Sequence, residues 1–294
     1  MTDLNLKGII AYPITPYSKN GELDLNALKE IIEKLIATEA NAITVLGSAG
    51  ESAYLEVDEW QQVLATSIQT INKRVPILCG IAELKTSTVI EKINIAEKLG
   101  VDGHMIIPLS YWKLSDAEIL NFYQEVSKNC TKPIMLYNNP ATSGIDMKPE
   151  LIVEIFNKCK AVTIVKESTG DINRLHKIRE LSNNSIPVYC GSNSIALEFL
   201  SAGGKGWCSA APNIIGDLPS KLFKAIESQN LDLSKEIFYK IYPFLDFIVK
   251  GGLVKTVKAA YQIQGKNYGE GRKPLLPLSK DEKNKLGKIL VKLQ

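Results

Sequence analysis

The stretch VTIVKESTGD, Val162 to Asp171, joins a run of aliphatic and β-branched residues to a polar turn through a lysine. An apolar run bounded by turn residues is typical of a strand that is buried on both faces, as in a parallel sheet. Lysine is rarely buried unless it has a partner or a function. The position of Lys166 therefore raises the question of which kind of sheet contains this strand.

The same pattern recurs along the chain, where a short apolar run is followed by a longer amphipathic run about every thirty residues, as expected of βα units in a parallel sheet. Eight strands are predicted, in the segments GIIAYPIT, AITVLG, PILCGIA, GHMIIP, PIMLYNN, VTIVKES, PVYCGS and KGWCSA. Strict alternation favours a closed (β/α)8 TIM barrel over a doubly wound sheet, and no GxGxxG motif follows the first strand. The fold class is therefore predicted as α/β, a (β/α)8 TIM barrel with a C-terminal helical extension.

The length of 294 residues fits one barrel of roughly 250 residues with an addition. The barrel is predicted over residues 1–228, and a helical appendage packed on the barrel over residues 229–294. Asn26, Ser87 and Ser115 are predicted to cap the N-termini of helices, and Gly100 is a predicted helix stop.

Composition and charge narrow the classes of function. The chain is 45% hydrophobic and 23% charged, which is ordinary for a globular protein with a sizeable core. Its net charge of +3 comes from 35 basic and 32 acidic residues spread along the chain, so nucleic-acid binding has no support. No segment approaches the roughly 18 uninterrupted apolar residues of a membrane span, and the N-terminus does not read as a secretory signal. We expect a cytoplasmic protein without a membrane partner, and its five cysteines, which lack CxxC spacing, are expected to be reduced.

The predicted barrel changes the interpretation of Lys166. Active sites of this fold form at the C-terminal ends of the strands, where Lys166 ends the sixth strand and Tyr137 the fifth. Adjacent strands lie about 4.8 Å apart, so both side chains can converge on one small ligand. A lysine in such a pocket can pair with a carboxylate, bind an anion as a cation, or act as a neutral amine nucleophile.

Two further segments bear on this choice. GSAGES, residues 47–52, follows the second strand, and its small residues let backbone N–H groups form an anion nest suited to a carboxylate, while the Ser48 hydroxyl can pass a proton. A tight βα turn would explain the same residues. LYNNPATSG, residues 136–144, places Tyr137 before a loop fixed by proline, and packing with a hydrogen-bonded hydroxyl is the alternative for this tyrosine.

The segments GSAGES, YNNPATSG and VKESTGD, together with AYPITPYSKNGELD and IPLSYWKLS, resemble the dihydrodipicolinate synthase and N-acetylneuraminate lyase family, in order and over essentially the whole chain. The resemblance implies a barrel with a C-terminal helical extension, a homotetramer built as a dimer of dimers, and a Schiff base between a lysine and a 2-oxo acid. It implies no metal or organic cofactor. The two histidines, His104 and His176, are accordingly interpreted as structural.

Carried over by position, the resemblance implies a set of catalytic residues. Lys166 matches the Schiff-base lysine, and Tyr137 the tyrosine that shuttles protons. Ser48 matches the hydroxyl of the proton relay, and Tyr111 the tyrosine that completes this relay from the neighbouring subunit. The substrate carboxylate is expected on the amides of Ser48 and Ala49.

The sequence departs from the family pattern at three places. Thr142 stands where the lysine-biosynthetic synthases usually have an arginine that secures the carboxylate of the second substrate. Ala49 replaces a threonine, and losing a charge-assisted contact of this kind can cost about 1.5 to 3 kcal/mol. Trp207 and Cys208 replace small aliphatic residues, which indicates either barrel packing or a reshaped pocket wall. Thr142 and Cys208 are therefore predicted to contact substrate.

The predicted function is a Schiff-base lyase, an aldolase, dehydratase or deaminase acting through Lys166 on pyruvate or a longer 2-oxo acid. The departures favour a catabolic relative of dihydrodipicolinate synthase. The first alternative is 4-hydroxy-tetrahydrodipicolinate synthase of lysine biosynthesis. The second is a barrel that binds a 2-oxo acid without catalysis.

Overall fold

Eight parallel strands close into a barrel in the computed structural model, which describes residue 4 and residues 6–293. Each strand pairs with its neighbours in chain order, and the last strand pairs with the first to close the sheet. The strands span Gly8–Ala11 (β1), Ala42–Val45 (β2), Ile77–Ile81 (β3), Gly103–Ile106 (β4), Ile134–Asn138 (β5), Val162–Glu167 (β6), Val188–Cys190 (β7) and Gly206–Ser209 (β8). The predicted (β/α)8 TIM barrel is confirmed.

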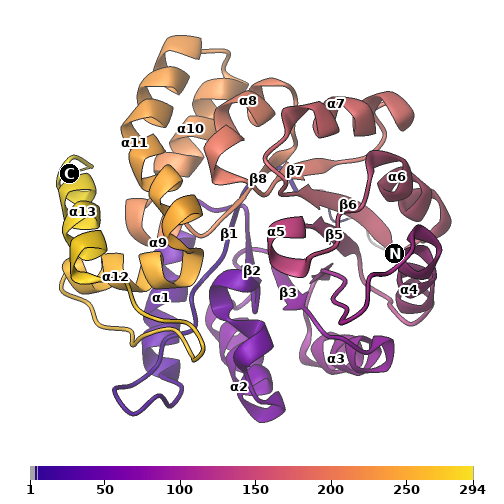
Figure 1. The fold of residues 1–294 in the computed structure, drawn as a ribbon, viewed down its shortest axis with the longest axis horizontal. Helices are drawn as coiled ribbons and strands as arrows, with labels where there is room; N and C mark the ends of the chain where they lie inside the picture. Colours follow the sequence, from indigo (N-terminus) through magenta and orange to yellow (C-terminus); the bar gives the residue numbers. More distant parts are fainter. Residues whose placement is uncertain (1–3, 5, 294) are drawn as a thin grey trace.

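Helices ring the strands in Figure 1 and cover the outside of the barrel. They span Leu25–Ala37 (α1), Val57–Ile71 (α2), Thr86–Leu99 (α3), Asp116–Lys128 (α4), Pro140–Ser143 (α5), Pro149–Lys158 (α6), Ile172–Leu181 (α7), Ala196–Ser201 (α8), Pro212–Ile215 (α9), Leu218–Glu227 (α10), Leu231–Gly251 (α11), Leu253–Ile263 (α12) and Lys280–Val291 (α13). The strands are short and mostly apolar because one face fills the barrel and the other packs on this ring. In the part of the chain that the structure describes, no helix is long and apolar enough to cross a membrane.

Local capping explains several helix ends and corrects two predictions. Ser115 caps α4 in a reciprocal capping box with Glu118, as predicted for this serine. Gly100 ends α3 in the left-handed conformation, also as predicted. The cap of α1 is Asp24 rather than Asn26, because the Asp24 carboxylate accepts the Ala27 N–H at 2.9 Å and the helix begins at Leu25.

The prediction that Ser87 caps a helix is also wrong. The helix α3 begins at Thr86, so Ser87 lies inside its first turn, and Lys85 occupies the cap position without a side-chain bond.

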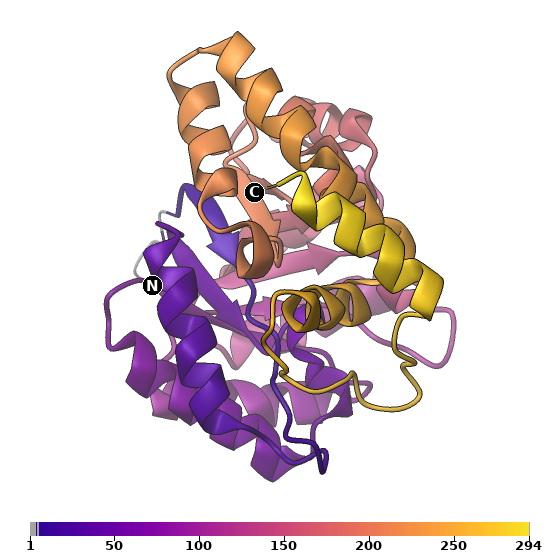
Figure 2. The same cartoon turned by 90° about the vertical axis from the view of Figure 1, so that its left-hand side faces the viewer.

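Three helices, α11, α12 and α13, gather at one side of the barrel, and α13 lies at the front of this group in Figure 2. The apolar stripe of α11 is buried, and α12 contacts α9 and the turn after β2. In α13 the leucines Leu286 and Leu290 are buried while the lysines face outward, as its amphipathic pattern predicts. The division between barrel and appendage at residue 228 stays a prediction.

Candidate active site

Lys166 lies in the mouth of the barrel, where it is only 6% exposed. It pairs in register with Tyr137 on β5, as the strand ends predicted. The Lys166 Nζ lies 4.0 Å from the centroid of the Tyr137 ring and 4.2 Å from that of Tyr12, and 3.7 Å from the Met105 sulfur. Among the described residues, no carboxylate oxygen lies within the 4.0 Å of an ion pair with this amine. Two aromatic faces thus take the place of a counter-ion.

The residue after the lysine explains how the strand holds it. Side chains alternate along a strand, so Glu167 points away from the barrel interior when Lys166 points into it. The buried Glu167 carboxylate accepts bonds from Asn138 Nδ2 at 3.0 Å, Arg174 Nε at 3.1 Å and the Thr169 amide at 2.7 Å. Because this network joins the ends of β5 and β6, it fixes the two strand ends that carry Tyr137 and Lys166.

Gly191, after β7, leaves room for the lysine side chain. A Cβ atom at this position would lie 3.1 Å from Lys166 Cε and 1.7 Å from Ser168 Oγ. Any larger residue would displace both side chains. The glycine therefore belongs to the site although it offers no functional group.

The phenol of Tyr137 has a partner that the sequence did not indicate. Asn139 Nδ2 donates a hydrogen bond of 2.7 Å to Tyr137 Oη. A phenolic oxygen that accepts one bond still has its own proton to donate. Asn139 thus leaves the Tyr137 proton available to a ligand on Lys166. The only signal for this hydrogen bond in the sequence was the second asparagine of YNNP, and an asparagine there is equally typical of an ordinary loop residue.

The GSAGES segment forms a 3₁₀ turn, Ser48–Gly50, at the end of β2. The first N–H groups of a helical turn have no partner within it, so the Ser48 and Ala49 amides are available to an anion. Gly47 before them packs against Tyr12, because a Cβ there would lie 2.8 Å from its ring. The exposed Ser48 lines the same cavity as Lys166, yet among the described residues it makes no hydrogen bond to Tyr137.

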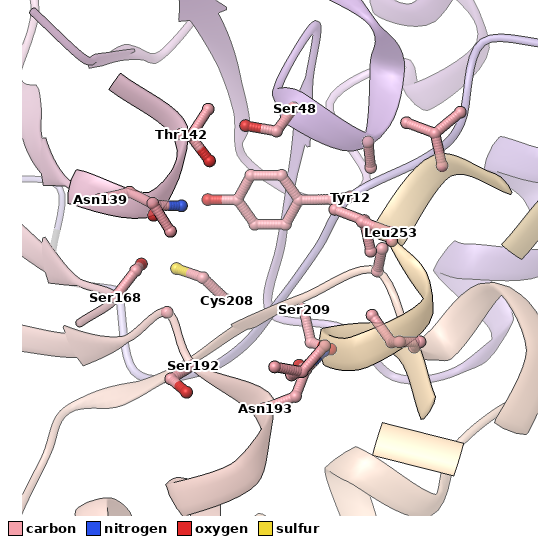
Figure 3. A pocket seen from close by; sticks show the side chains of 18 of the residues that line it. Tyr12, Ser48, Asn139, Thr142, Ser168, Ser192, Asn193, Cys208, Ser209 and Leu253 are labelled. Carbon is pink, nitrogen blue, oxygen red and sulfur yellow. The ribbon is translucent and has the colours of Figure 1, made fainter. Parts of the chain in front are cut away.

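Tyr12, directly after β1, is a second phenol in the site that the sequence did not single out. Its hydroxyl donates to the Met105 sulfur at 3.2 Å, and Figure 3 shows its ring among Ser48, Thr142 and Cys208. Burial is the main cause that raises its pKa well above the ordinary value, so it stays protonated at neutral pH. Tyr12 can hold the Lys166 amine and shape the pocket. The sequence did not indicate this role, because a tyrosine directly after an apolar strand is also typical of packing.

A cavity of about 670 Å³ opens above the lysine. Its floor is the barrel mouth and one wall comes from the appendage, with Leu253 and Lys255 of α12. Small polar side chains supply much of the rest, among them Ser168, Ser192 and Asn193 (Figure 3). Lys166 and Lys255 are the basic residues of the lining.

One cluster elsewhere combines side chains that can bind metals. Glu97, His104 and Cys130 place ligand atoms within 4.8 Å of one another near the start of β4, away from the barrel mouth. The Glu97 carboxylate already accepts the backbone N–H groups of Thr131 at 2.8 Å and Lys132 at 3.1 Å. This bonding joins α3 to the loop before β5, so a structural role explains the cluster.

Burial lowers the pKa of His104 to about 4, so it is neutral at pH 7. The other histidine, His176, lies exposed on α7 and does not line the cavity.

The Dihydrodipicolinate synthetase family model matches residues 5–293. The chain belongs to the dihydrodipicolinate synthetase family. The 4-hydroxy-tetrahydrodipicolinate synthase 1 of Halalkalibacterium halodurans is 30% identical over 283 residues, which cover 96% of each chain. The corresponding synthase of Rickettsia felis is 32% identical over 288 residues, 98% of this chain and 97% of that protein.

Solved structures of the family agree with the fold. A Pseudomonas aeruginosa protein provisionally described as a dihydrodipicolinate synthetase is 44% identical, with a TM-score of 0.96 over 98% of this chain and 100% of the other. The dihydrodipicolinate synthase of Thermotoga maritima is 27% identical, with a TM-score of 0.93 over 98% of both chains. The family resemblance seen in the sequence is confirmed. The chain is an enzyme of the class I lyases, which use a lysine Schiff base.

The residues that depart from the family pattern lie in different surroundings. Thr142, on α5, and Cys208, on β8, both line the cavity, and their contact with substrate stays a prediction. Burial raises the pKa of the Cys208 thiol while nearby Lys166 opposes this, so a neutral thiol faces the pocket. Trp207 is fully buried and does not line the cavity, so barrel packing explains it.

Tyr111 is the predicted site residue that this chain does not bring to its own lysine. It lies on the loop after β4, is 86% exposed and does not line the cavity. Its ring meets Trp112 edge to face at 5.3 Å, and that neighbour is also exposed. The structure therefore groups Lys166, Tyr137, Ser48, Ala49, Thr142 and Cys208, and leaves Tyr111 outside.

Proposed function

We propose that this enzyme forms a Schiff base between Lys166 and the ketone of pyruvate or a longer 2-oxo acid. The carrying observation is a buried amine that has no carboxylate partner among the described residues and lies between the rings of Tyr137 and Tyr12. A lysine retained only for ion pairing would be expected to have a counter-ion. A lysine attacks a ketone as the neutral amine, and an amine without a carboxylate contact has no ion pair to break before it reacts.

The groups around Lys166 fit the successive steps. The amine forms a bond to the ketone carbon while the ketone oxygen takes a proton, and loss of water then gives an iminium. Tyr137, whose oxygen accepts from Asn139, would supply the proton to the departing oxygen. The substrate carboxylate would bind the Ser48 and Ala49 amides. The iminium accepts the electron pair when a C3 proton or a C3–C4 bond is lost.

For the second half of the reaction, the names of the curated relatives favour the synthase of lysine biosynthesis over a catabolic relative. In that reaction the C3 carbon of the enamine on Lys166 forms a bond to the aldehyde carbon of aspartate semialdehyde, whose oxygen takes a proton. This synthase activity is our first candidate. Lys255 is the remaining cation in the cavity lining that could face the carboxylate of the semialdehyde.

One specific observation favours a second candidate, a lyase for a longer, hydroxylated 2-oxo acid. The uncharged side chains Thr142, Ser168 and Asn193 line the cavity beyond the lysine. Neutral hydroxyl and amide groups bind substrate hydroxyls by hydrogen bonds and do not replace a cation at a carboxylate.

The assembly and location of the enzyme are also proposals. We infer a cytoplasmic homo-oligomer, a dimer of dimers by family resemblance, in which Tyr111 of one subunit reaches the site of its neighbour. The exposure of Tyr111 and Trp112 on one loop supports this arrangement, because large aromatic residues are enriched at interfaces.

Borohydride reduction in the presence of pyruvate tests the Schiff base. We expect a stable mass increase on the peptide that carries Lys166, and none in Lys166→Ala. An adduct on another lysine, or none at any 2-oxo acid concentration, would contradict the mechanism. Calorimetric binding of pyruvate without an adduct would favour the non-catalytic alternative.

A coupled assay with pyruvate and aspartate semialdehyde separates the two candidates. Turnover at an ordinary enzymatic rate supports the synthase. If turnover is absent, a panel of hydroxylated 2-oxo acids, followed by release of pyruvate or loss of substrate, tests the second candidate.

A further inference from the structure

A fully buried ion pair links the appendage to the turn that follows β2. Lys258, on α12, places its Nζ 2.6 Å from Oε1 of Glu51, and both side chains are 0% exposed. Glu51 directly follows the Ser48–Gly50 turn. The two residues belong to opposite ends of the chain, so only the folded appendage brings them together.

Further contacts hold both members of the pair. The second Glu51 oxygen accepts the Arg272 backbone N–H at 2.7 Å, and Lys258 donates to the Glu270 carbonyl at 3.0 Å. Both cations contact the Tyr17 ring, whose centroid is 4.1 Å from Lys258 Nζ and 4.7 Å from Arg272 Cζ. The Glu51 carboxylate is thus tied to two separate segments of the appendage.

This arrangement acts on the backbone of the turn. Glu51 has a φ of +55°, in the left-handed region that non-glycine residues seldom adopt. Strained backbone of this kind persists where surrounding contacts determine it. On the other side, the Thr15 hydroxyl donates to the Gly50 carbonyl at 2.7 Å. The turn that presents the Ser48 and Ala49 amides is therefore held between the loop after β1 and the appendage.

Stability alone does not explain a charged pair in this position. Removing two charges from water is costly, and apolar residues of similar volume often give equal or greater stability than a buried ion pair. An ion pair with added hydrogen bonds does, however, define one geometry. The paired charges here therefore suit a role in placing the turn.

We infer that the Glu51–Lys258 ion pair positions the Ser48 and Ala49 amides to bind the carboxylate of the 2-oxo acid. Lys258 is then a positioning residue, and the appendage is part of the active site. The inference rests on the proposed Schiff-base function, because it concerns how that substrate is held. The inference assigns two separate parts of substrate recognition: the Lys166 amine reacts with the ketone, and the Ser48 and Ala49 amides bind the carboxylate.

Comparing two carbonyl compounds in borohydride trapping tests this separation. Pyruvate has a carboxylate, whereas acetone offers only the ketone. In Lys258→Met we expect the half-saturating concentration of pyruvate for trapping to rise about 10- to 100-fold, the scale of a lost charge-assisted contact. Trapping by acetone should change less than about threefold, because Lys166 keeps its surroundings. A general loss of structure would instead lower both reactions together.

Lys92→Met is the matched control. Lys92 is also a buried cation, paired with Glu83 and lying 5.0 Å from the centroid of the Trp60 ring, but it belongs to α3. We expect the ratio of pyruvate to acetone trapping to stay at the wild-type value in this variant. If the ratio of pyruvate to acetone trapping falls in Lys92→Met as well as in Lys258→Met, the inference is overturned, since replacing any buried cation would then have the same effect.

Glu51→Gln provides a second variant that keeps the size of the side chain and removes its charge. We expect its pyruvate preference to fall in the same direction by about 3- to 10-fold, and it decides the question alone if Lys258→Met does not fold. A folded Lys258→Met or Glu51→Gln protein with the wild-type preference overturns the inference while leaving Lys166 chemistry intact. If the wild-type protein traps no pyruvate, the proposed function itself fails and the inference falls with it.

Discussion

Lys166 and Lys258 are both buried amines, but their surroundings differ in one respect. Lys258 contacts a carboxylate and a carbonyl oxygen, whereas Lys166 meets two aromatic faces and a sulfur. Burial is the main cause that lowers the pKa of Lys258, and the nearby Glu51 carboxylate opposes this shift. The counter-ion keeps Lys258 a cation with a fixed position.

The contrast teaches which buried lysine is available for chemistry. An ion-paired amine would have to leave its carboxylate before it could attack a carbonyl. Lys166 has no such contact to lose among the described residues, and the neighbouring Tyr12 stays protonated, so its phenol does not become a counter-ion. The four predictions below test this comparison, from the largest expected effect to the smallest.

Replacing Lys166 by methionine should remove activity and spare the fold. We expect turnover to fall by about 10⁴-fold or more, the scale of losing a residue that acts covalently. The free energy of unfolding should be unchanged or higher, because a buried amine without a carboxylate is replaced by an apolar chain of similar length. Steady-state rates and urea denaturation measure both quantities. A destabilised protein would show that Lys166 has a structural counter-ion after all.

Replacing Lys258 by methionine should have the opposite effect on stability. The change leaves Glu51 buried without its partner, which costs about 3 to 5 kcal/mol of the free energy of unfolding. Urea denaturation at neutral pH measures the loss. In the double variant Glu51→Gln/Lys258→Met, much of this loss should be recovered because no unpaired charge remains. Equal stability of the single and double variants would contradict this account.

His104 extends the comparison to an imidazole that is buried and neutral. Its pKa is about 4 in the folded protein and near 6.5 when unfolded, so the unfolded chain binds the proton first as pH falls. Stability should therefore drop by roughly 3 kcal/mol between pH 6.5 and pH 4 and show no further loss from this group below. His104→Gln, which keeps an N–H donor, should lose less over that interval. Urea denaturation at several pH values measures the difference, and parallel curves for the two proteins would refute it.

Asn139 tests the phenol beside the reactive amine. In Asn139→Leu the hydrogen bond to Tyr137 Oη is lost, and a neutral bond of this kind contributes about 1 kcal/mol, roughly five- to tenfold in rate. We expect kcat to fall by that factor while KM for pyruvate changes less than about twofold, because the carboxylate site is separate. Initial-rate kinetics give both constants. A change confined to KM would place Asn139 in substrate binding rather than in positioning the tyrosine.

Much of the site followed from local sequence. The predicted ends of two adjacent strands placed Lys166 and Tyr137 at the barrel mouth, and the structure pairs the two residues in register. The turn at Ser48 was expected from its small residues and its place after the second strand. The helix caps were less certain, because Asp24 and not Asn26 starts α1. The roles of these residues in catalysis stay predictions.

Other parts of the site could not be read from the chain. Asn139 looked like a loop residue and Tyr12 like strand packing, and neither pattern shows which atom lies nearby. Lys258 lay in an amphipathic helix where a lysine is usually exposed to solvent.

The sequence by itself determined the alternating strands and helices, and with them the lysine at a strand end, because periodicity is a property of neighbouring residues. Only the tertiary structure decided that α12 walls the cavity and that Lys258 meets Glu51. Closing the barrel and docking the appendage bring together residues that are distant in the chain, and this contact has no local signal. The reactive amine was therefore visible in the sequence, while the residues proposed to hold its substrate were not.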